Sequence, residues 1–212
     1  MSALPQVGEL ALDALKRRPK RPHEASFFFF DPAFARAAVK ILPGEYFVHD
    51  EDLAITTTLG SCVAACLHDR SAGVGGMNHF MLPDAGDEAS GGRFGAFAME
   101  LLINDLIKQG ARRGSLEAKI FGGGQVMKSL ANTFIGEKNV AFVKNFLAQE
   151  RIPVLGSDVL DIYPRRVCMF PHTGRVLCKR LPAAEARKAE QQDVQYGAEV
   201  ARQRGGEVEL FS

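Results

Sequence analysis

The composition of this 212-residue chain is that of a globular protein, with 46% hydrophobic and 24% charged residues. A chain of this length buries one substantial core, so we expect a single domain with appended ends. Its 26 Lys and Arg residues balance 25 Asp and Glu residues. No net charge therefore attracts it to nucleic acid or to an anionic membrane, and neither is an expected partner.

The N-terminus and the cysteines indicate the compartment. The first residues lack a long apolar run and a small-residue cleavage site, and the apolar stretch 27–30 is too short to span a bilayer. We therefore expect a cytoplasmic protein that is not inserted in a membrane. A reducing cytoplasm keeps cysteines as free thiols, so at least one of them is available for chemistry: Cys62, Cys66, Cys168 and Cys178.

Both ends of the chain differ in composition from the middle. Residues 1–40 combine a basic stretch at 16–21, the phenylalanine cluster 27–30 and an Asp-Pro turn, so we interpret them as an N-terminal extension. We expect the phenylalanines to pack onto the main domain, predicted over residues 41–181. Residues 182–212 are rich in Ala, Glu, Gln, Lys and Arg and are predicted to be a helical or disordered tail.

The first half of the main domain has the character of strands. Residues 46–48 and 53–59 are rich in β-branched and aromatic side chains. After a break at Gly60 and Ser61, the segment 62–67 is small and apolar, and a turn leads into a second apolar stretch at 74–82. If these two segments are adjacent strands, Cys62 and His79 lie close together.

The second half mixes helices and strands. Apolar spacing predicts helices around 94–106, before Gly110, and around 140–147. A strand is expected at 116–121, and a β-hairpin is expected from 166–170 and 175–180. Clustered strands with helices between some of them favour an α/β or α+β fold, a single layered domain with mixed β-sheets flanked by helices.

Cys62 and His79 are the residues with the clearest chemical potential. Cysteine hydrolysis needs a thiolate, a base within hydrogen-bond reach of the sulfur and a third group that orients the base. Gly60 allows a substrate carbonyl to approach the main chain, and amides near Ser61 and Cys62 would form an oxyanion hole. Without further context, a buried cysteine or histidine is more often a core residue.

Two other patterns are less informative. The glycines 122–124 are not followed by the Gly-Lys-Ser/Thr of a phosphate-binding loop, so a tight turn after a strand is the better interpretation. Cys168, His172 and Cys178 lack a fourth ligand and the spacing of a zinc site. We expect neither a metal nor another cofactor.

Residues 56–62 and 75–83, with the lead-in 41–46, resemble the CheD family of chemoreceptor glutamine deamidases, and the resemblance continues through 99–110 and 117–124. Leu-Gly-Ser-Cys followed by a histidine inside Met-Asn-His-Phe-Met-Leu-Pro is a specific pattern. The resemblance implies a Cys-His-Thr hydrolase scaffold similar to that of certain deamidating toxins.

Carried over by motif, the resemblance makes Cys62 the nucleophile, His79 the base and Thr56, six positions before the cysteine, the third member. Strand alternation puts Thr56 and Thr58 on one face and Thr57 on the other, so Thr58 is the competing candidate.

The function implied is a protein-glutamine glutaminase, a cysteine amidohydrolase acting in bacterial chemotaxis adaptation. It would convert receptor glutamines to glutamate through a thioester, with release of ammonia, and the same acyl-enzyme allows receptor methylesterase activity. Chemoreceptor cytoplasmic domains are the expected substrate. One alternative is a different acyl substrate, and another is a non-catalytic binding partner of chemoreceptors or of a CheC-type phosphatase.

Overall fold

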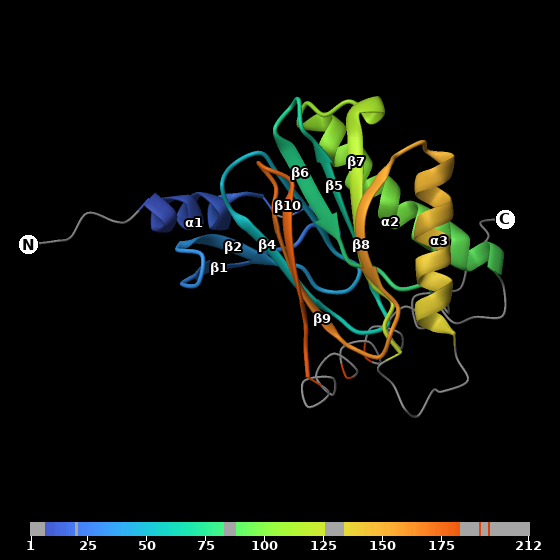
Figure 1. The fold of residues 1–212 in the computed structure, drawn as a ribbon. Coiled ribbons are helices and arrows are strands. Elements are labelled where there is room, and N and C mark those ends of the chain that lie inside the picture. The colour runs from blue at the N-terminus through green and yellow to red at the C-terminus, as the bar shows by residue number, and fades with distance from the viewer. Residues whose placement is uncertain are drawn as a thin grey trace, which may run out of the picture.

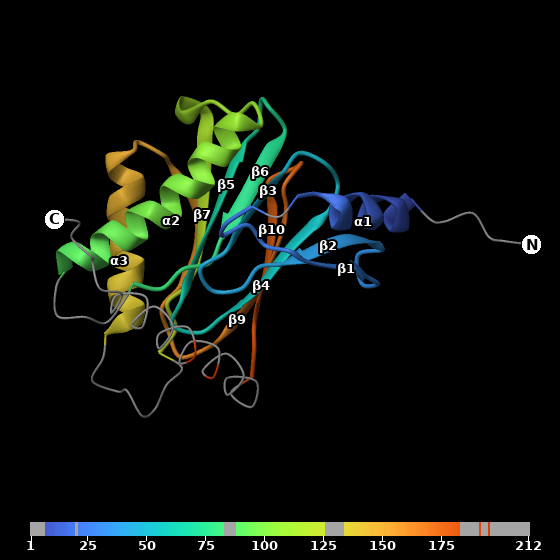
Figure 2. The ribbon, with the colours of Figure 1, turned by 180° about the vertical axis from the view of Figure 1, so that it is seen from behind.

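The computed structural model describes residues 7–19, 21–82, 88–125 and 134–182 and the single positions 191 and 195. Within them, two five-stranded sheets pack face to face, and two helices cover the outer face of one sheet (Figures 1 and 2). These layers confirm the predicted class, an α/β fold with mixed sheets flanked by helices.

The helix-covered sheet, called sheet 1 here, consists of β3 (Tyr46–His49), β6 (Val74–Asn78), β5 (Val63–Asp69), β7 (Leu116–Gly122) and β8 (Val154–Val159), in that spatial order. Its neighbours are antiparallel except β7 and β8, which are parallel. All seven residues of the central strand β5 are buried, because both faces of the sheet are covered.

The second sheet, sheet 2, has the order β1 (Phe27–Asp31), β2 (Arg36–Lys40), β4 (Ala54–Leu59), β9 (Arg165–Phe170) and β10 (Arg175–Arg180). The parallel pairing of β2 with β4 places residues before 41 inside the domain. The boundary expected at residue 40 therefore does not separate an appended segment, since two of the five strands precede it. Most of the predicted tail, 182–212, lies outside the described residues.

Strand alternation divides the interior into two cores. Val63, Ala65 and Leu67 of β5 face helices α2 (Glu88–Lys108) and α3 (Ile135–Gln149). Cys62, Ala64 and Cys66 point the other way, into the core between the two sheets. Cys62 is therefore enclosed between the sheets, at the end where β5 begins.

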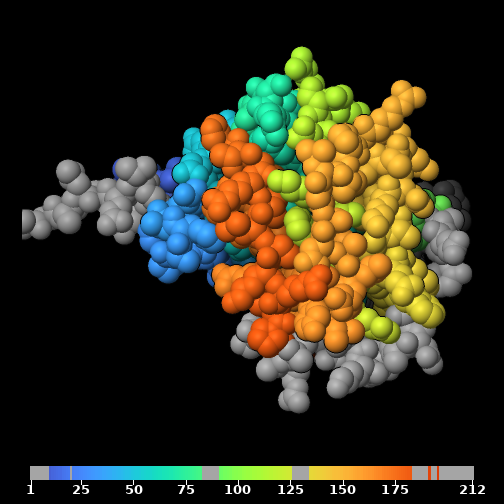
Figure 3. All heavy atoms as spheres, in the orientation of Figure 1, coloured from blue at the N-terminus to red at the C-terminus, as the bar shows by residue number. Residues whose placement is uncertain are grey.

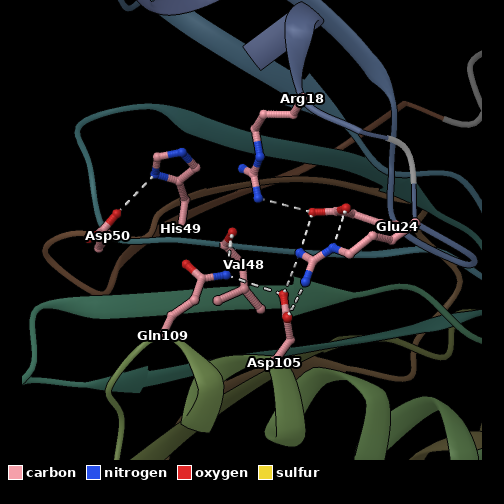
Figure 4. A network of polar contacts seen from close by, with 8 residues as sticks. Arg18, Glu24, Val48, His49, Asp50, Asp105 and Gln109 are labelled. Carbon is pink, nitrogen blue, oxygen red and sulfur yellow. Dashed lines mark hydrogen bonds and ion pairs between the residues drawn. The ribbon is translucent and has the colours of Figure 1, made fainter. Parts of the chain in front are cut away.

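The N-terminal segment, which includes α1 (Val7–Arg17), is tied to α2 by a polar network (Figure 4). The Arg21 guanidinium donates to Glu24 at 2.8 and 2.7 Å and to the buried Asp105 at 2.7 and 3.0 Å. These two carboxylates raise the pKa of Arg21. Gln109 donates to Asp105 and to the Val48 carbonyl, so the network joins three parts of the chain. None of the described helices is both long and apolar enough to cross a bilayer.

Candidate active site

Cys62 and His79 meet at one end of sheet 1. Val63 and Phe80 exchange two backbone hydrogen bonds of 2.9 Å and therefore lie directly opposite each other. Cys62 and His79 each precede one member of this pair, so they occupy diagonal positions on the opposite face of the pairing. The structure thus places the two residues on the same face of adjacent strand segments.

Thr57 approaches the histidine from sheet 2. Its Oγ1 lies 2.9 Å from His79 Nδ1 and also 2.9 Å from the Ile41 carbonyl oxygen. The carbonyl only accepts, and the hydroxyl has a single proton to donate to it, so Nδ1–H of His79 donates to Thr57. Nε2 then carries the lone pair. It is buried and has no hydrogen-bond partner among the described residues.

Thr56 does not make the expected contact. Its hydroxyl donates to the Val39 carbonyl at 3.3 Å, on the face of β4 that points away from the histidine. Thr58 shares that face and is half-buried. The hydroxyl that meets His79 belongs to Thr57, which the sequence analysis had placed on the opposite face from both candidates.

The sequence held a signal for this choice. Ile55 and Leu59 lie on the same face of β4 as Thr57, and both belong to the same core cluster as Cys62. The face of β4 with the large apolar side chains is the one that packs on sheet 1. Thr57 lies between Ile55 and Leu59 on this face of β4, and its side chain is therefore directed toward Cys62.

Burial controls the charge of the imidazole. The side chain of His79 is almost completely enclosed, and loss of hydration lowers its pKa to about 3; Lys40 lowers it further, while the Ile41 carbonyl raises it. The resting imidazole is therefore neutral at neutral pH. A neutral ring with its proton on Nδ1 is the form that can accept a proton from a thiol.

The turn that carries Cys62 is held at three consecutive carbonyls, those of residues 60–62. A trans peptide points its C=O and N–H in opposite directions, so fixing these oxygens also fixes the directions of the amides that follow them. The amides of Ser61 and Cys62 are in this way set before substrate arrives. The three donors, in order, are the Gly124 amide at 2.8 Å, Asn139 Nδ2 at 2.9 Å and the Gly123 amide at 2.7 Å.

The glycine loop at 122–124 must approach the nucleophile turn very closely. Gly122 has φ +104°, and a Cβ there would lie 2.2 Å from the Cys62 carbonyl oxygen. Any other residue at this position would be strained and would collide with the turn. The loop is thus a tight turn after β7 that packs against the turn carrying Cys62.

Asn139 of α3 is a site residue that the sequence analysis missed. Its fully buried side chain donates to the Ser61 carbonyl at 2.9 Å and accepts from the Leu82 amide at 2.8 Å. It thereby links the turn before Cys62 to the segment after His79. Its neighbours at buried helix positions are Val140 and Val143, so a lone polar residue on an apolar helix face was the available signal.

The remaining candidates have packing roles. Ser61 is buried, and its hydroxyl lies 3.7 Å from Met81 Sδ. Cys168 and Cys178 lie on the paired strands of the predicted hairpin and are free thiols. In the part of the chain that the structure describes, no group of three His, Cys, Asp or Glu side chains is arranged to hold a metal.

A cysteine beside a neutral, oriented histidine at the end of a buried strand is the arrangement of a thiol hydrolase. Comparisons with known proteins identify the family. A family model described as CheD chemotactic sensory transduction matches residues 81–180. The probable chemoreceptor glutamine deamidase CheD 1 of Albidiferax ferrireducens is 53% identical, over 94% of this chain and 86% of its own. The chain belongs to the CheD family.

Other relatives extend this result. The probable chemoreceptor glutamine deamidase CheD of a Janthinobacterium species is 47% identical over 91% of this chain and 98% of its own. That of Methylobacillus flagellatus is 50% identical over 88% and 96%. Among solved structures, the Bacillus licheniformis hypothetical protein YfiH aligns with a TM-score of 0.37 at 13% identity, over 55% of this chain and 51% of that one.

Proposed function

We propose that this chain deamidates glutamine side chains on the cytoplasmic domains of chemoreceptors, with Cys62 as nucleophile and His79 as base. The observation that carries the proposal is the contact of Thr57 with His79 Nδ1, which leaves the Nε2 lone pair available on the face shared with Cys62. Family membership supplies the substrate class, since the relatives bear the name chemoreceptor glutamine deamidase.

The first half-reaction forms a thioester. The resting pair is a thiol and a neutral imidazole, because burial disfavours the imidazolium. His79 Nε2 takes the thiol proton as the sulfur attacks the carboxamide carbon. Amides of the turn 60–62 receive the negative charge that develops on the carboxamide oxygen, a contribution of about 3 kcal/mol per donor.

Loss of ammonia completes the thioester and ends the first half-reaction, and hydrolysis then releases glutamate in the second half-reaction. His79 passes its proton to the departing nitrogen, the C–N bond breaks and ammonia leaves. Water then attacks the thioester while His79 accepts one of its protons, and the thiol is restored. A glutamate methyl ester would give the same acyl-enzyme with methanol as the leaving group, so methylesterase activity is part of the proposal.

In this mechanism Thr57 takes the orienting role expected of Thr56, and Asn139 is a positioning residue. Thr57 accepts a hydrogen bond from Nδ1–H of His79, which stabilises the transient imidazolium and prevents the ring from turning. Asn139 holds the peptide between Ser61 and Cys62.

The experiment is mass spectrometry of a receptor cytoplasmic fragment after incubation with wild-type protein, Cys62→Ala or Cys66→Ala. Cys66 is the matched control, because it lies on the same strand and the same face, buried like Cys62. We expect conversion of glutamine to glutamate by wild type and by Cys66→Ala only. Equal conversion by Cys62→Ala would remove Cys62 as nucleophile, and no conversion by wild type would refute the receptor as substrate.

A further inference from the structure

An exposed apolar surface lies beside the nucleophile turn. The connection between β8 and β9 presents Leu160, Ile162 and Tyr163 to solvent, with Ile162 61% exposed. Phe134, just before α3, is 59% exposed. These four side chains are called the apolar rim here. Figure 3 shows the β8–β9 connection and the start of α3 on either side of the end of β7, at the lower edge of the molecule.

The part of the rim between β8 and β9 is held in a fixed shape by a buried cation. The Arg165 guanidinium is completely enclosed and donates to the Tyr163 carbonyl at 2.9 Å and to the Leu160 carbonyl at 2.6 Å. It also binds Asp158 at 2.9 and 2.7 Å. Leu160 adopts φ +64°, a conformation rarely used by a branched side chain. A costly buried charge thus stabilises a strained, solvent-facing loop.

The same loop is hydrogen-bonded to the structure that supports Cys62. The Leu160 amide donates to the Gly122 carbonyl at 2.8 Å, and the Gln125 amide donates to the Asp161 carbonyl at 2.7 Å. The Gly124 amide in turn donates to the Gly60 carbonyl. The rim is therefore two hydrogen-bonded steps from the nucleophile turn.

The charges around the rim are paired with one another. Asp158 binds both Arg165 and Arg180, and Asp161 also binds Arg180. Because its charged side chains are paired, the loop presents mainly apolar groups to a binding partner. Exposed apolar groups gathered beside a reactive site are characteristic of a binding surface.

We propose that the apolar rim binds the apolar side chains that flank the substrate glutamine in the receptor segment. This inference rests on the proposed function and adds the surface that recognises the substrate. Ile162 is its central contact, because it is the most exposed member and stands on the loop that Arg165 fixes.

The test measures binding without catalysis, using the full chain with Cys62→Ala and a fluorescently labelled receptor cytoplasmic fragment. Adding Ile162→Ser is expected to weaken binding by about tenfold, the loss that follows from removing one buried aliphatic contact. Phe134→Ser is expected to weaken it in the same direction. Leu155→Ser is the matched control, since Leu155 is 55% exposed at the other end of β8, and its affinity is expected to stay within about twofold.

Three results would overturn the inference: unchanged affinity with Ile162→Ser, equal weakening by Ile162→Ser and Leu155→Ser, or no binding of the fragment to the Cys62→Ala parent. The proposed function is judged separately, by glutamine conversion with Cys62 intact. Conversion by wild type together with any of these three results would leave the deamidase and remove the rim as its docking surface.

Discussion

The two ends of the inter-sheet face of β5 carry the same residue types in different settings. Cys62 and His79 lie at one end, while Cys66 and His68 line a small cavity of about 70 Å³ toward the other. At the second end a glycine also packs closely, because a Cβ on Gly174 would lie 2.5 Å from the His68 ring. Residue composition alone does not distinguish the two places.

Hydrogen bonding does distinguish them. His68 Nε2 lies 3.3 Å from the His172 carbonyl oxygen, so that nitrogen carries the proton and acts as a donor. Burial raises the pKa of the Cys66 thiol well above its usual range, which keeps it protonated. At the first end Nδ1 is bonded and Nε2 is available. The two histidines are thus held in opposite tautomers, with the proton on Nδ1 of His79 and on Nε2 of His68.

The largest expected effect on activity is at His79, and it distinguishes His79 from His68. His79→Gln should lower kcat for receptor deamidation about 10³-fold, because the thiol loses its base. His68→Gln should leave kcat within about threefold. Rates measured by mass spectrometry on one receptor fragment give both values. Comparable losses in the two variants would mean that the second end also takes part in the reaction.

The next effect separates the threonines of β4. Thr57→Val should lower kcat about 30-fold with little change in KM, because the imidazole loses the group that orients it. Thr57→Ser keeps the hydroxyl and should recover most of the rate. Thr56→Val, which removes the hydrogen bond to the Val39 carbonyl, is the matched control. If Thr56→Val lowered kcat and Thr57→Val did not, the orienting role would pass to Thr56.

A smaller effect is expected at Asn139. Asn139→Asp keeps the acceptor for the Leu82 amide but replaces the donor to the Ser61 carbonyl with an oxygen. We expect kcat to fall about tenfold at nearly constant KM, since the amide of Cys62 is no longer held in place. Asn145→Asp, the same change at an exposed position of α3, should be neutral. A loss of kcat that merely follows the unfolded fraction would assign Asn139 to stability alone.

The smallest effect is on stability against pH. His79 has a folded pKa of about 3 against 6.5 unfolded, so below pH 6.5 the unfolded chain binds a proton that the folded chain does not. Stability is therefore lost as pH falls, by about 2 kcal/mol between pH 7 and pH 5 from this group. Burial also lowers the pKa of His49 and His68, but it does so in wild type and in His79→Gln alike. Denaturant unfolding of the two proteins at both pH values therefore isolates the contribution of His79. Equal losses in the two proteins would contradict the assignment.

Pairing between strands that are close in sequence explains why the positions of Cys62 and His79 could be predicted. Cys62 and His79 lie on neighbouring strands joined by a short turn, so alternation and turn signals in one stretch of sequence place them together. Asn139, in contrast, reaches Ser61 from a helix 78 residues further along the chain. Sequence spacing gives no measure of that approach.

The sheet partners of β4 were also beyond local reasoning. β4 pairs with β2 on one side and with β9, more than a hundred residues away, on the other. Alternation separated Thr57 from Thr56 correctly, but which face meets His79 depends on how the two sheets pack. For the same reason, the Phe27–Asp31 and Arg36–Lys40 strands looked like an extension until their partner was known.

The hydrogen bond between Thr57 and His79 joins two sheets whose strands are completed at different points along the chain. Every strand of sheet 1 lies between residues 46 and 159, so this sheet and its cysteine–histidine pair can form before the last part of the chain emerges from the ribosome. Sheet 2, which carries Thr57, is complete only when residues 165–180 have been added. The strands next to Cys62 and His79 can therefore pair before sheet 2, which holds Thr57 against His79, has all of its strands.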